Sequence, residues 1–546
     1  MALAAGLALA TISLIDPTIK LLDFAITFVH DARHSSKAAS ENGLKLSELK
    51  NRYDSLQKVL FQEEKFSFVK GRLFDALPVK TQRLGLHMFR EFPQLLFEYN
   101  AVEASYQSSQ TSSELSGSST GDILSLDELQ IIFEKEDANH ELVTTPEIRV
   151  GRWRSLVWSA RGKKRSERLI SQVEDWLTRI KSLLEDVWWP LPFLEYSINL
   201  QALESDSDVQ AVGLAESVGL RKLLVDDAKL PSQMKLETLQ LDVRRFDDAC
   251  RGLSDYEGET VLVEYAPYTP NSDGFLPGLL RRRFAELACL LNQQKDSRFR
   301  ALHCLGYVDS TFPRLEFQLL FQLPTVSLKP PAHLLSLYTS KQVQKPSLGA
   351  RFQLCFQLAQ SMSLFHSVNW IHKSFRSTNV LFSPTSSDTD RSLGIEFTSP
   401  FVVGFEASRL TNDFSSGPYD NLLSQNVYRH PDRWGIPNKT FTKYHEIYSL
   451  GIVLLEIGLW EPAETMGGNN FKAVKQIPTA ISGALLKQAE RRLAHRCGEK
   501  FREVVVRCLK GDFGIAADMD DRLDSELQEK FRKCVLENLE ELATVV

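Results

Sequence analysis

The pattern of apolar and polar positions predicts that the chain begins with helices. From residue 3 to about residue 103, apolar residues return every three or four positions, the spacing that places them on one face of a helix. Two such stripes are Leu14, Ile19, Leu22, Ala25 and Ile26, and Leu46, Leu49, Tyr53, Leu56 and Leu60. β-branched residues in alternation are scarce here, so we expect helices throughout.

A serine-rich segment interrupts this pattern between residues 105 and 121. It has too little apolar surface to offset the entropy of ordering, so we expect a flexible loop there. A second amphipathic stretch follows, and its apolar stripe predicts another helix: Leu169, Val173, Trp176, Ile180, Leu183 and Val187. Residues 1–200 are therefore predicted to form an all-α helical bundle.

Residues 201–235 are predicted to connect this bundle to a domain with a different periodicity. The alternation at 261–266 is typical of a strand. Further elements are expected in this order: a helix over 279–293, strands over 302–308 and 315–323, and an apolar helix over 351–369. The order predicts a two-lobed α+β domain over 236–546, with a small lobe at about 236–324 and a large lobe at about 325–546.

Length and composition indicate a folded protein with several domains. The chain has 546 residues, 43% hydrophobic and 25% charged, with a formal net charge of −6. A disordered chain and a protein with overall affinity for nucleic acid are therefore not expected. The seven cysteines all lie between residues 250 and 534, without a C-x-x-C pair, which predicts reduced, buried thiols in the cytoplasm rather than disulfides or a zinc site.

The histidines add no metal site to this prediction. His303, His366 and His430 lie on apolar or turn segments, and none has a ligand-like neighbour that the sequence reveals. We therefore expect neither a metal ion nor another cofactor.

The N-terminal residues allow two interpretations. The chain has no run of eighteen apolar residues, so no constitutive transmembrane helix is predicted. Residues 1–15 are apolar but lack the positive start of a signal peptide. Either they form a buried first helix of the bundle, or they insert into a membrane under certain conditions.

Basic residues are concentrated at the start of the last bundle helix. The candidates for contact with a membrane are Arg152, Arg154, Arg161, Lys163, Lys164, Arg165 and Arg168. Such a cluster is either a solvated face of the bundle or a surface for anionic lipid headgroups, which attract each basic residue by about 1 kcal/mol. Nucleic acid fits less well, because no nucleic-acid-binding module accompanies the cluster.

Residues 1–200 resemble the fungal HeLo (prion-inhibition and propagation) domain. The resemblance rests on the small apolar N-terminus running into Leu21-Leu22-Asp23-Phe24, and on the block from Trp158 to Glu174. It implies an all-α bundle. Several members of that family act in fungal programmed cell death, where release of the N-terminal segment lets it disrupt membranes.

Residues 371–381 read Ile-His-Lys-Ser-Phe-Arg-Ser-Thr-Asn-Val-Leu. They resemble the catalytic loop of protein kinases, whose pattern is H-R-D-L-x-x-x-N. His372 and Asn379 match the His and the Asn of that pattern. Ser374 stands where a working kinase has the Asp that accepts the proton of the substrate hydroxyl. A neutral serine hydroxyl cannot act as that base.

Other parts of the kinase pattern lie upstream of this loop. Residues 261–266 resemble the strand that supplies the lysine for the ATP phosphates, and Ala266 stands at the lysine position. The helix over 279–293 resembles the helix that carries the partner acid, for which Glu286 is the candidate. No glycine-rich phosphate loop precedes these elements.

Downstream, residues 404–406 stand in place of the D-F-G motif. Gly404 replaces the magnesium-binding Asp, Phe405 retains the Phe, and Glu406 replaces the Gly. Further matches follow in the order of the family: Pro431 and Asp432, then Glu446 and Gly451.

The resemblance implies a pseudokinase, because the lysine and both aspartates are replaced within an otherwise ordered pattern. We therefore expect no enzymatic activity. The expected function is that of a signalling or programmed-cell-death protein, in which the kinase-like domain regulates a bundle that acts on membranes or partners. Two alternatives stay open: an atypical active kinase that binds ATP and uses Glu406, and a scaffold without membrane activity.

The expected location is the cytoplasm, with conditional membrane association through the first helix. The sequence identifies neither the protein partner nor the upstream sensor, and it leaves self-association open.

Overall fold

The computed structural model describes residues 8, 10–31, 37–111, 163–188, 191–225, 234–236, 244–246, 251–268, 278–310, 314–324, 330–383, 394–405, 409–410, 423–434, 441–468, 471, 477–515 and 523–545. The chain divides into two compact units. The first comprises Met1–Phe193 and Ala202–Ala215, and the second comprises Leu194–Gln201 and Glu216–Val546.

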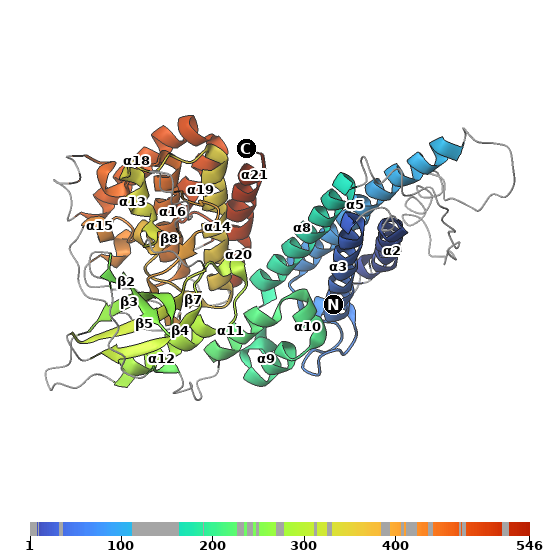
Figure 1. Cartoon of the computed structure of the whole chain (residues 1–546), viewed down its shortest axis with the longest axis horizontal. Helices are drawn as coiled ribbons and strands as arrows, with labels where there is room; N and C mark the ends of the chain where they lie inside the picture. The colour runs from blue at the N-terminus through green and yellow to red at the C-terminus, as the bar shows by residue number, and fades with distance from the viewer. Residues whose placement is uncertain are drawn as a thin grey trace. The chain divides into compact units, whose positions relative to one another are not determined.

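The first unit is helical in the parts that the structure describes. Its helices are α2 (Ile15–Asp31), α3 (Lys37–Phe61), α4 (Leu73–Ala76), α5 (Val79–Thr111), α8 (Lys163–Trp188) and α10 (Ser207–Val212). Helix α3 packs against α2, α8 and α10, and α5 packs against α2 and α8. Figure 1 shows α5 and α8 side by side. The predicted all-α character of this unit is confirmed for its described residues.

The core of the first unit is an aromatic cluster contributed by three helices. Tyr53 of α3, Phe89 and Phe92 of α5, and Trp176 of α8 are all buried. The rings of Phe92 and Trp176 are stacked with their centroids 4.2 Å apart, and Phe89 meets Trp176 edge to face at 5.3 Å. The indole N–H of Trp176 donates to the carbonyl of Met88 at 2.8 Å. The cluster therefore buries large apolar rings without leaving this donor unpaired.

The predicted stripe of α8 is confirmed where its side chains are described. The buried members are Leu169, Val173, Trp176, Ile180 and Leu183. Val187 lies outside the side chains that the structure describes. Burial of one face explains why this segment is helical although its other face is strongly polar.

The prediction of a flexible loop over 105–121 is wrong for its first residues, because α5 continues to Thr111. Extending an existing helix costs much less than starting one, so polar residues can continue a helix that packing has already formed. Residues 112–121 lie outside the described part of the chain.

The second unit contains a five-stranded antiparallel sheet with the order β1-β2-β3-β5-β4. Its strands are β1 (Arg244–Arg245), β2 (Arg251–Tyr256), β3 (Glu259–Pro267), β4 (Cys304–Ser310) and β5 (Glu316–Gln322). Strands β2 and β3 form a hairpin around Glu257 and Gly258, which both have positive φ, at +54° and +84°. A two-residue turn with positive φ at both positions matches the right-handed twist of the two strands that it joins. Helix α12 (Gly278–Asn292) packs against β4.

The rest of the second unit is mainly helical. Its helices are α11 (Ala215–Val225), α13 (Leu334–Thr339), α14 (Leu348–Ser367), α15 (Leu423–Asn426), α16 (Lys443–Leu459), α18 (Pro478–Cys497), α19 (Glu499–Lys510), α20 (Leu523–Phe531) and α21 (Glu537–Val545). Two small antiparallel sheets accompany them, formed by β6 (Ala332–His333), β8 (Val380–Phe382) and β9 (Phe401–Val402), and by β7 (Trp370–Ile371) and β10 (Arg409–Leu410). Within this unit, the long helices gather on one side of the five-stranded sheet (Figure 1).

Helix α16 is the centre of the helical part, since almost every residue from Lys443 to Leu459 is buried. Two glycines let other helices approach it closely. A Cβ at Gly451 would lie 2.9 Å from Cβ of Cys508, and a Cβ at Gly458 would lie 2.7 Å from the ring of Phe501. Both contacts come from α19, which explains why glycine occupies these positions of a helix.

The predicted elements of the second unit correspond to β3, α12, β4, β5 and α14, each within a few residues of its expected bounds. The coarse prediction of a protein of several units that combines helices with a small β-rich region is confirmed, and the structure shows that the sheet is antiparallel. Among the described residues, no helix is long and apolar enough to cross a membrane.

Candidate functional site

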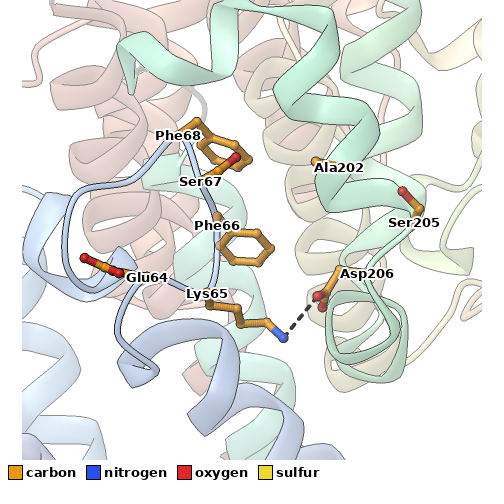
Figure 2. A pocket seen from close by; sticks show the side chains of 8 residues that line it. All are labelled: Glu64, Lys65, Phe66, Ser67, Phe68, Ala202, Ser205 and Asp206. Carbon is orange, nitrogen blue, oxygen red and sulfur yellow. Dashed lines mark ion pairs between the residues drawn. The ribbon is translucent and has the colours of Figure 1, made fainter.

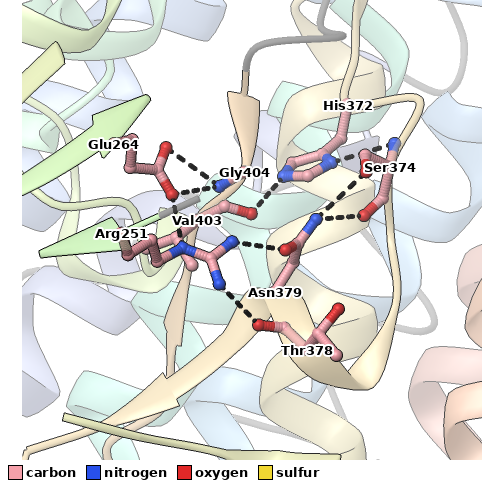
Figure 3. Close-up of polar contacts among 8 residues, drawn as sticks. All are labelled: Arg251, Glu264, His372, Ser374, Thr378, Asn379, Val403 and Gly404. Carbon is pink, nitrogen blue, oxygen red and sulfur yellow. Dashed lines mark hydrogen bonds and ion pairs between the residues drawn. The ribbon is translucent and has the colours of Figure 1, made fainter. Parts of the chain in front are cut away.

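The predicted site residues His372, Ser374 and Asn379 lie on the loop between β7 and β8 (Figure 3). His372 is buried. Its Nδ1 accepts a hydrogen bond from the backbone N–H of Ser374 at 3.2 Å, so the ring proton lies on Nε2 and is donated to the carbonyl of Val403 at 3.0 Å. The ring packs on Phe405 with 4.5 Å between centroids. His372 therefore joins the loop to residues 401–405.

Asn379 holds the same loop from its other end. Its Nδ2 donates to the carbonyl of Ser374 at 2.7 Å and lies 3.1 Å from the Ser374 hydroxyl. Its Oδ1 accepts a hydrogen bond from Nη2 of Arg251. Both ends of the amide are thus engaged, and the side chain is 1% exposed.

Gly404 adopts a conformation that leaves no room for a side chain. Its φ is +84°, and a Cβ would lie 2.2 Å from Nδ2 of Asn379, far inside van der Waals contact. A carboxylate at this position would require Asn379 to move. The backbone N–H of Gly404 donates instead to both carboxylate oxygens of Glu264, at 2.8 and 3.1 Å.

Arg251 and Glu264 form a buried ion pair that sequence reasoning missed. Nε of Arg251 lies 2.8 Å from Oε1 of Glu264, and both side chains are 4% exposed. Nη1 of Arg251 also donates to the carbonyl of Thr378 at 2.9 Å. Strands β2 and β3 therefore bind the loop at Thr378 and Asn379 through one guanidinium. We call the set Arg251, Glu264, Asn379 and Gly404 the polar latch.

The latch determines what this place in the fold can do chemically. The carboxylate of Glu264 is paired with Arg251, and both of its oxygens accept from the Gly404 N–H, so it is engaged within the latch. Oδ1 of Asn379 already accepts from a guanidinium, and a divalent cation there would face the positive charge of Arg251. The site has a fixed cation but no free carboxylate among these four residues.

The other predicted positions lie apart from the latch or outside the described residues. Ala266 is on β3, two residues beyond Glu264 and therefore on the same side of the strand, but it is Glu264 that reaches Gly404. Glu286 is partly buried on α12. Glu406 lies outside the described part of the chain.

A second buried carboxylate, Glu456 of α16, binds the same loop at Ser377. It accepts hydrogen bonds from the hydroxyl of Ser377, from the hydroxyl of Tyr428 at 2.9 and 3.0 Å, and from the backbone N–H of Ala463 at 2.7 Å. Burial raises the pKa of Glu456 to about 7, although these three donors oppose the increase. Because the folded protein holds this proton more tightly than the unfolded chain, Glu456 links stability to pH.

We expect the free energy of unfolding to fall as pH rises from about 4.5 to about 7, by at most about 3 kcal/mol from this group. The direction follows from the raised pKa, since ionising Glu456 costs more in the folded protein than in the unfolded chain. Glu456→Gln should remove this part of the slope while other groups titrate as before. Urea unfolding of both proteins across this pH range measures the difference, and parallel curves would contradict it.

Glu446, at the start of α16, fixes the same loop by a third contact. Its Oε1 accepts from the backbone N–H of Lys373 at 2.9 Å, and its Oε2 lies 2.6 Å from Nε2 of His366. Lys373 has φ +63°, an uncommon conformation for lysine, which this hydrogen bond helps to hold.

The expectation that the histidines have no ligand-like neighbours is wrong for two of the three. His366 pairs with Glu446, and His430 lies near Asp432 and His445. Glu446 and His445 are brought close by the fold, so the local sequence did not reveal them, whereas Asp432 is only two residues from His430. His303 is exposed, and partial desolvation together with the nearby Lys295 lowers its pKa.

The predicted basic cluster is described only in part. Lys164 and Arg168 are exposed on the first turns of α8, and Arg165 is partly buried. Lys163 begins the helix. Arg152, Arg154 and Arg161 lie outside the described residues.

The first unit also has an open pocket of about 360 Å³ between residues 64–68 and residues 202–206. Lys65 lies at its edge (Figure 2), with Nζ 3.0 Å from Asp206 and 2.6 Å from Asp208. Burial lowers the pKa of Lys65, but its hydrogen bonds to the two aspartates outweigh this and raise it. Because its charge is already matched by two carboxylates, Lys65 offers little attraction to an anionic ligand.

Comparison with known families gives one match, over residues 293–542, to a family described as a domain of unknown function (DUF7580). The matched segment contains the loop at His372–Asn379, Gly404 and α16. It begins after β3, so Arg251 and Glu264 of the latch lie before it. No curated protein matches the chain.

Proposed function

We propose that residues 236–546 form a two-lobed kinase-like domain, with a small lobe at about 236–324 and a large lobe at about 325–546. Support comes from the order of the elements. Helix α12 is inserted between β3 and β4 of the antiparallel sheet, and the helical part follows. The loop with the kinase-like pattern and residues 401–405 contact each other through His372.

This domain, in our proposal, does not transfer phosphoryl groups and serves as a regulatory module. The observation that carries the proposal is the polar latch. Phosphoryl transfer needs a lysine and metal ions to position and neutralise the phosphates. Here Glu264, Asn379 and the backbone of Gly404 are bound to Arg251 or to one another, and Gly404 has no space for a carboxylate.

A thermal-shift titration with Mg-ATP tests the loss of nucleotide binding. A ligand at about a hundred times its Kd stabilises the folded protein by about 2.7 kcal/mol, which raises the melting temperature. We expect no shift at millimolar Mg-ATP, and the same curve when a chelator removes the magnesium. A saturable, magnesium-dependent rise would favour the active-kinase alternative and overturn the proposal.

The proposed target of this module is the N-terminal bundle, acting on an anionic membrane surface or on a protein partner in signalling or programmed cell death. Support comes from α8, whose apolar stripe is buried in the bundle while Lys164 and Arg168 are exposed at its start. Exposed basic residues at one end of a helix are attracted to anionic lipid by about 1 kcal/mol each.

Binding of the full chain to vesicles tests the membrane part of this proposal. The double variant Lys164→Glu/Arg168→Glu should bind anionic vesicles at least about tenfold more weakly than the wild type, from the loss and reversal of two charges. Arg83→Glu/Arg90→Glu is the matched control, because these two arginines are exposed on α5. If the wild type does not bind anionic vesicles, or both variants bind alike, the scaffold alternative is favoured.

A further inference from the structure

Two histidines and an aspartate meet at the beginning of α16. His430 precedes the 3-10 turn Pro431–Arg433, Asp432 lies in that turn, and His445 is on the first turn of α16. One ligand atom from each of the three lies within 4.8 Å of the others. None of these three residues belongs to the polar latch.

The two imidazole rings have the spacing of rings that share one ion. Their centroids are 5.2 Å apart, and their planes are at 71°. With metal–nitrogen bonds of about 2.1 Å and tetrahedral angles, two bound imidazoles have centroids roughly 5 Å apart. Ligand atoms then lie about 3.4 Å from one another, so closing the cluster requires movements of at most about 1.4 Å.

We propose that His430, Asp432 and His445 form a binding site for a divalent transition-metal ion of the zinc class. Two imidazoles and one carboxylate suit zinc and its neighbours in the transition series better than magnesium or calcium, which prefer oxygen ligands. His430 and Asp432 are 32% and 40% exposed. The three ligands therefore leave a position open to water or to a partner's side chain.

Thr442 already holds the ring of His445. The backbone N–H of Thr442 donates to Nδ1 of His445 at 2.9 Å, and the Thr442 hydroxyl lies 3.0 Å from the same atom. Nδ1 is therefore an acceptor here, and the ring proton lies on Nε2. Binding of a metal ion through Nε2 would place the proton on Nδ1, where the hydroxyl of Thr442 could accept it while the backbone N–H loses its acceptor.

The charges around the cluster determine how tightly we expect it to bind a metal ion. Asp432 supplies one negative charge, whereas Arg429 and Arg433 lie on the same segment and oppose a cation. Burial and the neighbouring Arg429 lower the pKa of Arg433, and its guanidinium lies over the ring of Phe441 at 5.5 Å. We therefore expect weaker binding than at closed structural zinc sites with four ligands.

The consequence of binding would be a cross-link between the turn at 430–433 and the N-terminus of α16. Tyr428, two residues before His430, already contacts Glu456 of the same helix. A metal ion would add a second attachment of this segment to α16, and the protein would gain stability by mass action. This inference does not depend on the proposed function of the polar latch.

Titration of the full chain, stripped of metal by a chelator, tests the site. Calorimetry with Zn²⁺ should give one site per chain, lost or weakened at least about tenfold in His430→Ala and in Asp432→Asn, since each removes a ligand. His87→Ala is the matched control, because His87 is an exposed histidine that also has a carboxylate nearby, Glu91 at 3.1 Å. The control should bind as the wild type does.

Titration with Co²⁺ separates this site from adventitious binding to the cysteines. Binding by histidine and carboxylate should give d–d absorption without a thiolate-to-cobalt charge-transfer band, and acidification should release the ion as the imidazoles protonate. Zn²⁺ binding that is unchanged in His430→Ala, or a charge-transfer band that accounts for all the bound Co²⁺, would overturn the proposal. So would the absence of binding to the wild type.

Discussion

Replacing Arg251 by methionine is expected to lower the free energy of unfolding of the second unit by about 3–5 kcal/mol. Methionine fills much of the same volume but leaves the carboxylate of Glu264 buried without its cation. It also removes the hydrogen bonds to the carbonyl of Thr378 and to the side chain of Asn379. Urea unfolding, with the transition of the second unit compared between variant and wild type, measures the loss.

Arg502→Met is the matched control for this prediction. Arg502 pairs with Glu499 at 2.5 Å, but the side chains of the pair are 29% and 66% exposed. Solvent screens such a pair, and its removal should cost less than about 1 kcal/mol. An equal loss in the two variants would show that burial of the Arg251–Glu264 pair has no special weight.

The double variant Arg251→Met/Glu264→Leu tests the cause of the loss. Removing both charges avoids the unpaired carboxylate, so this variant should be more stable than Arg251→Met alone by about 1 kcal/mol or more. The gain is incomplete because the backbone N–H of Gly404 loses its acceptor. If the double variant is less stable than either single one, the penalty does not arise from an uncompensated charge.

Gly404→Ala is expected to destabilise the second unit by about 2–4 kcal/mol, for two reasons that can be separated. An L-residue at φ +84° is strained by about 1 kcal/mol or more. The new Cβ would also lie 2.2 Å from Nδ2 of Asn379, which must move and give up its contacts with Ser374 and Arg251. The same unfolding experiment measures the sum of both effects.

Gly258→Ala isolates the strain, because Gly258 also has φ +84° but no heavy atom within 4 Å of its Cβ position. It should cost only about 1 kcal/mol. In the background Asn379→Ala, Gly404→Ala should cost little more than Gly258→Ala does, since the clashing amide is gone. Equal losses at Gly404 and Gly258 in the wild-type background would mean that Asn379 does not occupy this space.

The sequence predicted the elements that carry the site better than the site itself. Strand β3 shows an alternation and helix α14 is a long apolar stretch, and the positions of both agree with the structure. Strand β2 was missed because Arg-Gly-Leu-Ser-Asp-Tyr has no regular alternation, and Arg251 was missed with it. The Glu257-Gly258 turn just before β3 was the available signal, because a residue followed by glycine commonly closes a hairpin.

The choice between Ala266 and Glu264 could not be made from the sequence. Residues two apart on a strand face the same side, so either could reach the loop. The answer depends on which of the two residues the fold places beside Gly404, and that residue is Glu264. The cluster of His430 and His445 was missed for a similar reason, because it depends on how the chain folds between them.

The most direct test of whether the polar latch closes this place to nucleotide is hydrogen exchange of the wild-type chain with and without millimolar Mg-ATP. We expect peptides covering residues 372–379 and 401–405 to exchange slowly in both conditions, because Glu264 and Asn379 already hold Gly404 and the loop. Rapid exchange without nucleotide, followed by protection when Mg-ATP is added, would show that a nucleotide binds where the latch closes. That result would contradict a non-catalytic module.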